Sequence, residues 1–525
     1  MNLLIVAALL SLVLSAAVGF SSRGRHPRLA TWLAQASALV IIGVAVTLSV
    51  QVAVEGAFHG SLILLREVAV TVHLDAVSIT MLLLISFIGW VVVRFAATYL
   101  DGEARHGKFT GWLCMTLAAV LLLVISGNLL QLVFAWIATS LFLHRLLLFY
   151  PHRVAARRAA AKKFVAARLS DAALILAATL LTIAYETTDI ASILNAARAG
   201  SGGGLAIIAA GFLAAAAIFK SAQFPMHGWL TEMMETPTPV SALLHAGVIN
   251  AGGFLLIRFA DVMLLAPEAL AVLVMIGGFT ALFGGLVMLT QSMVKTSLAW
   301  STVAQMGFMV LECGLGLFPL ALLHIVAHSL YKAHAFLASG GTVDQIAANS
   351  RPGPVAVPKV AAVGRAFLMA LAIYAAVGFG FGFQHKSPQA IALGAILIFG
   401  VAYMLAQGLA DTAPRELTQL TIVYAVATSV SYFVLQVFAV QLTFGVLPAA
   451  PTPGPLQWAL IILAVITFGI VAILQAMLPL WSYHPAAAGL RVHLLNGFYA
   501  NAVFDRLLRG WRLPTATLSV KRYSK

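Results

Sequence analysis

The chain has 525 residues, of which 62% are hydrophobic and only 9% are charged. A soluble domain carries about 25% charged residues, so the composition excludes an ordinary soluble protein and favours a membrane protein. The formal net charge of +14 is compatible with a nucleic-acid partner, but the positions of the basic residues along the chain indicate membrane topology instead.

About fifteen apolar runs are long enough to cross roughly 30 Å of hydrocarbon at about 1.5 Å per residue. The sequence therefore predicts an all-α polytopic membrane protein with 14 or 15 transmembrane helices. The expected spans cover residues 2–20, 31–54, 75–99, 111–126, 128–149, 163–185, 204–224, 240–260, 266–289, 297–315, 317–339, 357–382, 389–410, 417–444 and 456–482.

The first span has no basic residue before its apolar core, so we expect a retained helix and not a signal peptide. Cys114 and Cys313 both lie in apolar runs. We interpret them as buried small hydrophobic residues, without a disulfide framework or metal-binding spacing.

The loops between the spans differ in their content of Lys and Arg. Placing the N-terminus outside puts most of them on the cytoplasmic side, as the positive-inside rule requires. The sequence thus predicts a cytoplasmic (inner) membrane location, with the N-terminus outside and the C-terminus in the cytoplasm. The expected cytoplasmic residues are Arg23, Arg25, Arg28, Arg105, Lys108, Arg145, Arg153, Arg157, Arg158, Lys162, Lys163, Arg168, Lys295, Arg351, Lys359, Arg415, Arg491, Arg506, Arg509, Arg512, Lys521, Arg522 and Lys525. Those left outside are Arg66, Arg198, Arg258 and Lys386.

Lys220 ends an almost wholly apolar run, and His245 lies inside the next one. Intramembrane Lys and His are costly, so they usually line an ion path or a water-filled cavity. Pro225 follows Lys220 closely, which predicts a broken helix of the kind that exposes backbone groups beside an ion site.

The segment HIVAHSLYKAH places His324, His328 and Lys332 at successive i+4 spacings, on one face of a helix. A row of coupled basic groups can pass a proton along the helix. Two alternatives remain. The histidines can simply bond neighbouring helices, or His324 and His328 can ligate a metal, although no third ligand is in view.

Other candidates for deep ionisable groups are Lys295 and His334, with five acidic residues nearby: Asp75, Asp171, Glu232, Glu235 and Glu312. Lys386, Ser387 and Pro388 repeat the Lys-Ser-then-Pro pattern of the Lys220 region. The spacing hints at two inverted five-helix units, residues 111–260 and 266–410. Lys386 is equally compatible with an ordinary loop lysine.

Two segments carry a family resemblance: KSAQFPMHGWLTEMMETPTPVSALLHAG, and MVKTSLAWSTVAQMGFMVL with the later LLHIVAHSLYKAHAFLASGG. Both are similar to the signatures of the antiporter-like subunits of respiratory complex I and Mrp cation/proton antiporters. The resemblance implies two inverted five-helix repeats with broken helices, and a hydrophilic axis that moves protons. It assigns Lys220 as the broken-helix lysine and His245 as the next relay group. Lys295, His324, His328 and Lys332 continue the relay, and Glu232, Glu235 and Lys386 are further candidates.

One position departs from that pattern. The family has a Trp-Glu pair on the fifth helix, whose glutamate pairs with the central lysine, but here Trp136 is followed by Ile137. Glu232 or Glu235, or an acid from a partner subunit, would have to replace the missing carboxylate.

This variant, with LHRLLLFYPHRVAARRAAAKKFVAARLSD after it, resembles the DabB family of membrane subunits of inorganic-carbon transporters. The resemblance implies a zinc-containing, β-carbonic-anhydrase-like partner of the DabA type that hydrates CO2 to bicarbonate. This chain would conduct H+ or Na+ to drive that hydration in one direction, without a cofactor or enzyme activity of its own.

The expected organisation is N-terminal helices in 1–110, the two repeats, C-terminal helices in 411–482 and a basic, amphipathic cytoplasmic tail in 483–525. The tail could lie on the membrane or dock a partner. The alternative functions are a proton-pumping subunit of an NADH-quinone oxidoreductase, an Mrp-type Na+/H+ antiporter subunit, and a membrane scaffold without transport.

Overall fold

The structure is a computed structural model that describes residues 2–65, 68–341, 359–410, 413–481 and 484–509. Within these residues, 14 helices are long and apolar enough to cross a membrane, which confirms the predicted polytopic helical fold. The predicted span 297–315 corresponds to a further helix of similar length, α14 (Val294–Gly314). This helix is not among the 14; it is more polar and carries Lys295 and Glu312.

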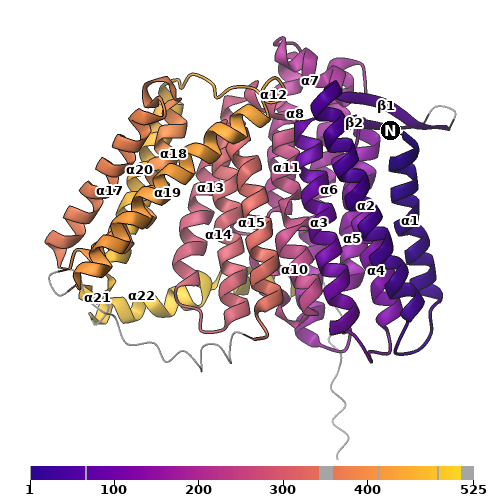
Figure 1. Ribbon diagram of the computed structural model, residues 1–525, viewed down its shortest axis with the longest axis horizontal. Helices are drawn as coiled ribbons and strands as arrows, with labels where there is room; N and C mark the ends of the chain where they lie inside the picture. Colours follow the sequence, from indigo (N-terminus) through magenta and orange to yellow (C-terminus); the bar gives the residue numbers. More distant parts are fainter. Residues whose placement is uncertain (1, 66–67, 342–358, 411–412, 482–483, 510–525) are drawn as a thin grey trace, which may run out of the picture.

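The long helices follow one another up and down the bundle (Figure 1). Besides α14 they are α1 (Asn2–Ser21), α2 (Arg28–Glu55), α3 (Ala76–Tyr99), α4 (His106–Val124), α5 (Leu129–Leu147), α6 (Val154–Tyr185), α8 (Gly203–Lys220), α13 (Pro267–Met288), α15 (Phe318–Ala338), α17 (Val360–Gly380), α18 (Pro388–Gly408), α19 (Arg415–Leu442) and α20 (Pro455–Ala476), with one interrupted span, α10 (Thr238–Ala246), η2 (Val248–Asn250) and α11 (Ala251–Arg258). Short helices are α7 (Ile190–Arg198), α9 (Gly228–Thr231), η1 (Met233–Glu235), α12 (Ala260–Leu264) and η3 (Phe383–His385).

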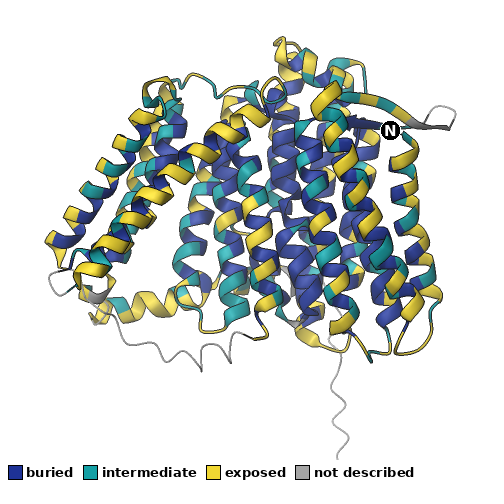
Figure 2. Cartoon of the chain, in the orientation of Figure 1, coloured by how far each residue is buried: buried dark blue, intermediate teal, exposed yellow. Residues whose placement is uncertain are grey.

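The interrupted span lies at the centre of the molecule. The most apolar window of Thr238–Arg258 is 94% buried, against 22% for the corresponding window of α20. Figure 2 shows the same contrast, with buried residues concentrated in the middle of the bundle and exposed ones along α17, α19 and α20. Apolar side chains exposed on such outer helices face lipid in a membrane protein, so the interior is where polar groups need partners.

Two helices end abruptly inside the bundle. α8 ends at Lys220, and the chain passes through a cis Phe224–Pro225 peptide before α9 begins. This confirms the predicted break after Lys220. The next span is interrupted in turn at Gly247, between α10 and η2. Both breaks bring backbone groups next to buried polar side chains.

A β-hairpin that the sequence analysis did not predict covers one end of the bundle, here called the hairpin end. Strands β1 (Phe58–Leu65) and β2 (Val68–Leu74) pair antiparallel. At the base of the hairpin, Asp75 caps α3 by accepting from the Ser78 amide and forms a two-pronged ion pair with Arg258 of α11. Burial tends to raise the pKa of Asp75, but the Arg258 guanidinium outweighs it and holds that pKa well below its usual range.

The opposite end, here called the tail end, carries the C-terminal helices α21 (Leu478–Trp481), α22 (Pro485–Leu495), η4 (Gly497–Tyr499) and α23 (Ala500–Arg509). Figure 1 shows α22 running along this end from the α20 side back towards the middle of the bundle. α23 contacts α9, so this part of the tail docks on the chain itself. The rest of the predicted basic tail, with Trp511 and Arg512, lies outside the described residues.

Candidate functional site

Lys220 is buried at the end of α8 and points at α5. Its Nζ donates to the Ser140 hydroxyl at 2.7 Å and approaches the Trp136 carbonyl at 3.4 Å. The same nitrogen lies 4.2 Å from the centre of the Trp136 ring, a cation–π geometry. A hydroxyl, a carbonyl and an aromatic face therefore surround the amine where the family pattern has a carboxylate.

Acidic residues do not bond to Lys220 directly in the described part of the chain. Asp171 of α6, buried and in contact with Arg168 at 2.5 Å, is the carboxylate that attracts Lys220 electrostatically. Glu232, considered above as a replacement for the missing glutamate, instead pairs with Lys162. The side chain of Glu235 lies outside the described structure.

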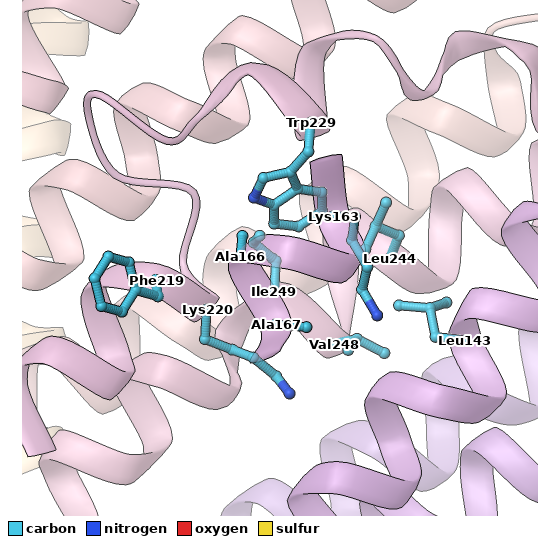
Figure 3. Close-up of a pocket in the computed structure, with 10 residues that line it drawn as sticks. All are labelled: Leu143, Lys163, Ala166, Ala167, Phe219, Lys220, Trp229, Leu244, Val248 and Ile249. Atoms are coloured by element: carbon cyan, nitrogen blue, oxygen red, sulfur yellow. The ribbon is translucent and has the colours of Figure 1, made fainter. Parts of the chain in front are cut away.

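A second buried lysine, Lys163, meets the same serine. Its Nζ donates to the Ser140 backbone carbonyl at 2.7 Å. Lys163 and Lys220 line one small cavity, together with Leu143, Ala166, Ala167, Phe219, Trp229, Leu244, Val248 and Ile249. Figure 3 shows both lysine side chains at this cavity, one from α6 and one from α8. The sequence analysis counted Lys163 with the cytoplasmic loop residues and began the expected span 163–185 at it, but α6 begins nine residues earlier, at Val154, so Lys163 lies well inside the helix.

Lys162 links the site to the tail end. Its side chain is fully buried between two carboxylates, Glu232 at 2.6 Å and Asp505 of α23 at 2.9 Å. Lys162 was also assigned to a loop, for the same reason. The run of alanines around the arginines and lysines, AARRAAAKKF, is the signal that could have extended the predicted helix, because Ala, Arg and Lys are strong helix formers.

His245 begins a second cluster and follows Leu244, a residue that lines the Lys220 cavity, on α10. Its Nδ1 lies 3.0 Å from the Thr302 hydroxyl, and its ring stacks on Phe336 at 4.2 Å. His328 Nε2 donates to the His245 backbone carbonyl at 3.2 Å. The interruption of the α10–α11 span after His245 thus coincides with a contact to α15.

The predicted stripe on α15 is present, since His324, His328 and Lys332 all lie on this one helix. Lys332 is buried and its Nζ donates to the Ser301 hydroxyl at 2.7 Å and the Leu298 carbonyl at 3.1 Å. His324 bonds Glu312 of α14 at 2.9 Å. Glu312 appeared above only as a nearby acid. Among the described residues no three His, Cys, Asp or Glu side chains gather as metal ligands.

The remaining candidates lie away from these clusters. Lys295 is half-buried and its Nζ donates to the Thr238 hydroxyl at 3.1 Å. Lys386 occupies the loop between α17 and α18, with its amine 5.4 Å from the centre of the Phe433 ring. His334 is exposed. The structure therefore brings together Lys220 with Lys163, and His245 with His328, and leaves Lys386 at the hairpin end.

Buried amines and imidazoles bonded mainly to hydroxyls and carbonyls suit proton transfer. Each imidazole can accept a proton on one nitrogen and release one from the other. An amine in a low-dielectric site loses its proton more readily than in water. The protonatable groups form two clusters: a lysine cluster towards the tail end and a histidine cluster on α10 and α15 that reaches Glu312 near the hairpin end. The lysine cluster holds Lys162, Lys163 and Lys220, and the histidine cluster holds His245, His324, His328 and Lys332.

Two family models match parts of the chain. Residues 126–351 match the family model described as NADH:quinone oxidoreductase/Mrp antiporter, transmembrane. Residues 66–110 match the model described as NADH-ubiquinone oxidoreductase (complex I), chain 5 N-terminus. The two matches together include the hairpin base, both lysine clusters and the α15 stripe.

Several curated relatives are similar in sequence. The chain is 39% identical over 450 residues to the probable inorganic carbon transporter subunit DabB2 of Halothiobacillus neapolitanus, covering 84% of this chain and 81% of the relative. It is 48% identical over 275 residues to a probable DabB of Hydrogenovibrio crunogenus, where the match covers 52% of this chain and 53% of the relative. The chain is also 34% identical to the NADH-quinone oxidoreductase subunit L of Pseudomonas aeruginosa, over 52% of this chain and 45% of the relative.

Solved structures share the fold. The Mrp complex from Dietzia superposes with a TM-score of 0.66 at 23% identity, covering 97% of this chain and 59% of that one. The archaeal membrane-bound sulfane sulfur reductase superposes with a TM-score of 0.57 at 18% identity, over 89% and 77% of the two chains. At these identities the likeness concerns the arrangement of helices.

Proposed function

Because this chain belongs to the DabB family of inorganic carbon transporter subunits, within the complex I and Mrp antiporter-like superfamily, we propose that it is the cation-conducting membrane subunit of an energy-coupled pump for CO2 or bicarbonate. It conducts H+ or Na+ down its gradient through the buried clusters of Lys and His side chains. The observation that supports this most directly is Lys220, an amine buried at a helix break beside a second buried amine, Lys163.

The partner in this proposal is a DabA-like, zinc-containing protein that hydrates CO2 in the cytoplasm. Cation passage through this chain would bias the partner between two states, so that hydration runs in one direction. Such coupling requires the cation to bind the two states with different affinity. The complex lies in the cytoplasmic membrane with the hairpin end outside and the tail end, with its many basic loops, in the cytoplasm.

The proposal is tested in cells that lack carbonic anhydrase. Co-expression of this chain with its partner is expected to restore growth in ambient air and accumulation of labelled bicarbonate. An uncoupler is expected to abolish the accumulation. Growth restored by the partner alone, or uptake indifferent to both H+ and Na+ gradients, contradicts the proposal.

Lys220→Ala gives a residue-level test in the same cells. Removal of the central amine is expected to reduce uptake by about a hundredfold or more, the scale of losing a proton-transfer group. Lys108→Ala is the matched control, because Lys108 is exposed near the tail end and is expected to leave uptake unchanged. Assembly with the partner is checked by co-purification. Normal uptake in an assembled Lys220→Ala complex removes Lys220 from the path.

A second function has support from the match to the complex I and Mrp models: a proton-pumping or Na+/H+ antiporter subunit of such a complex. Co-purification separates the two. A large zinc-binding partner supports the carbon pump, whereas a set of redox or Mrp subunits supports the second function.

A further inference from the structure

We propose that Glu312 and His324 form the port through which the cation enters from the hairpin end, and that this cation is H+. The inference rests on the proposed function and supplies its entry point and its ion. Glu312 lies two residues before the end of α14, and His324 lies six residues after the start of α15. Both ends belong to the hairpin end of the bundle, where the loop 315–317 joins them.

The pair is shielded but close to the surface. Glu312 Oε2 lies 2.9 Å from His324 Nδ1, and their side chains are 5% and 11% exposed. A buried carboxyl group and a neighbouring imidazole share one hydrogen bond, and the proton in that bond can reside on either group. The pair thus stands at the boundary between the bundle interior and the hairpin end.

From this pair the path continues down α15. The His324 and His328 ring centres are 6.1 Å apart, a separation that one bridging water spans. His324 Nε2 is buried without a hydrogen-bond partner among the described residues, so it is the nitrogen left to exchange a proton with His328. Because His328 donates its Nε2–H to the His245 carbonyl, its neutral ring carries the lone pair on Nδ1.

These contacts, with one water between the two rings, give the order of a transfer step. A proton on Glu312 passes to His324 Nδ1, and His324 releases the proton on Nε2 towards His328 Nδ1. His328 then carries the charge at the level of His245, and Lys332 lies one helical turn further along. No group needs an electron or a co-reactant, because only protons move. Each ring returns to neutral as its other tautomer, and it has to flip or exchange a proton before it passes the next one.

The chemistry of the port selects the ion. Alkali and alkaline-earth cations prefer several oxygen ligands from carboxylates, carbonyls and water. Here the inward neighbours of the single carboxylate are two imidazoles, which suit proton exchange and poorly replace the hydration of Na+. The stepwise passage His324 to His328 is therefore open to H+.

The groups that face the port set its response to pH. Towards Glu312 these are His324 from α15 and Tyr432 from α19, with Cys313 next to it in α14. Towards His324 they are Glu312 and His328, and His328 in turn faces Lys332 and His245. A shift in the pH profile of transport in a Glu312 variant therefore also reflects the effect of these neighbouring groups.

The experiment reconstitutes the purified complex of this chain with its partner in liposomes that contain a pH-sensitive dye. With an imposed proton gradient, Glu312→Gln is expected to lower the proton flux by about tenfold or more. Glu312→Asp keeps an ionisable group and is expected to retain part of the flux with a shifted pH profile. A merely structural role would lower flux equally in both variants without moving the profile.

Glu268→Gln is the matched control, since Glu268 is an exposed acid at the start of α13, also at the hairpin end. Its flux should equal that of the wild type. If the Glu312→Gln complex fails to assemble, His324→Asn is used in its place. This variant is expected to lower the proton flux by the same factor. If the assembled Glu312→Gln or His324→Asn complex has the proton flux of the wild type, the proposed port is wrong. It is also wrong if the wild-type complex carries Na+ but no H+.

Failure of the port and failure of the carbon pump are distinguishable. A wild-type complex that passes protons into liposomes but accumulates no inorganic carbon in cells contradicts the proposed function. In that case the proton flux of the Glu312→Gln complex is still measured in liposomes, and this measurement alone tests whether Glu312 is part of the entry port.

Discussion

At the scale of single residues, Ser140 lies where two buried lysine side chains meet. Two buried lysines from different helices bond to it, Lys220 to the hydroxyl and Lys163 to the carbonyl. A serine can accept both because it has two oxygens, the side-chain hydroxyl and the backbone carbonyl, and each accepts one of the bonds. The serine therefore supplies the acceptor that the missing glutamate at Ile137 would have offered, without adding a negative charge.

Ser140→Ala removes one of these two bonds and keeps the other. The Lys163 bond to the backbone carbonyl remains, but Lys220 loses its short acceptor, and an unsatisfied buried donor costs about 1–3 kcal/mol. We expect carbon uptake to fall by about fivefold or more. Thr139→Val is the control, because the Thr139 hydroxyl donates to the Ala135 carbonyl of its own helix. Equal uptake in both variants contradicts a role for the Ser140 hydroxyl.

Much of the candidate site could be predicted from the sequence, because an ionisable residue in an apolar run stands out. Lys220, His245, His328 and Lys332 are buried as expected. Lys163 was missed because a lysine beside a basic loop looks like a loop residue until the start of the helix is known. Partners such as Ser140 are invisible in one sequence, since hydroxyls are common in membrane helices and only packing shows which one faces a lysine.

At the scale of elements, the C-terminal tail acts as a strap across the tail end. Asn501 of α23 packs so closely on α9 that a side chain at Gly228 would collide with its amide. Asp505, four residues later, reaches the fully buried Lys162. The strap thus connects α20, at one edge of the molecule, with the residues next to the break after Lys220.

The strap predicts a stability effect that a double-mutant cycle measures. Asp505→Asn leaves Lys162 with Glu232, and we expect it to cost about 1 kcal/mol. Asp505→Asn with Glu232→Gln leaves the buried amine without a negatively charged partner, which costs about 3–5 kcal/mol. Thermal unfolding of the purified protein gives both values, with Glu416→Gln as an exposed control. Additive losses of equal size would show that the two carboxylates do not share Lys162.

The elements differ in how well the sequence predicts them. The spans were predicted within a few residues at most ends, because a run of about 20 apolar residues has few other structures available to it. The hairpin was missed, since its strands lie between spans and are held by the Asp75–Arg258 pair and by a bridge from Val72 to Ser126. The docking of α23 depends on contacts between residues far apart in the sequence.

At the scale of the whole molecule, the exposed basic loops lie together at the tail end. The loops after α1, α3 and α5 all emerge there and carry Arg23, Arg25, Arg105 and Arg153, and Lys108 follows in the first turn of α4. Charge at one end of a membrane bundle predicts its orientation. The division into two inverted five-helix repeats, 111–260 and 266–410, stays a prediction.

Cysteine labelling tests that orientation. Glu55→Cys places a thiol at the exposed end of α2 beside the hairpin, and Arg25→Cys places one in the exposed first loop at the tail end. The native Cys114 and Cys313 are fully buried and give little background. In intact spheroplasts, an impermeant maleimide should label the first variant, and the second only after permeabilisation. The reverse pattern would contradict the proposed orientation.

Lys163 and Lys220 both bond to Ser140, so their amines lie close together. This closeness limits how many protons the two amines can hold at once. Like charges in a low-dielectric interior repel strongly, so protonating one amine makes the other harder to protonate. We therefore expect the two lysines to share one added proton between them. We expect the complex to move one charge through this half in each conformational cycle. A reversal-potential measurement should then give a whole-number ratio of protons to bicarbonate.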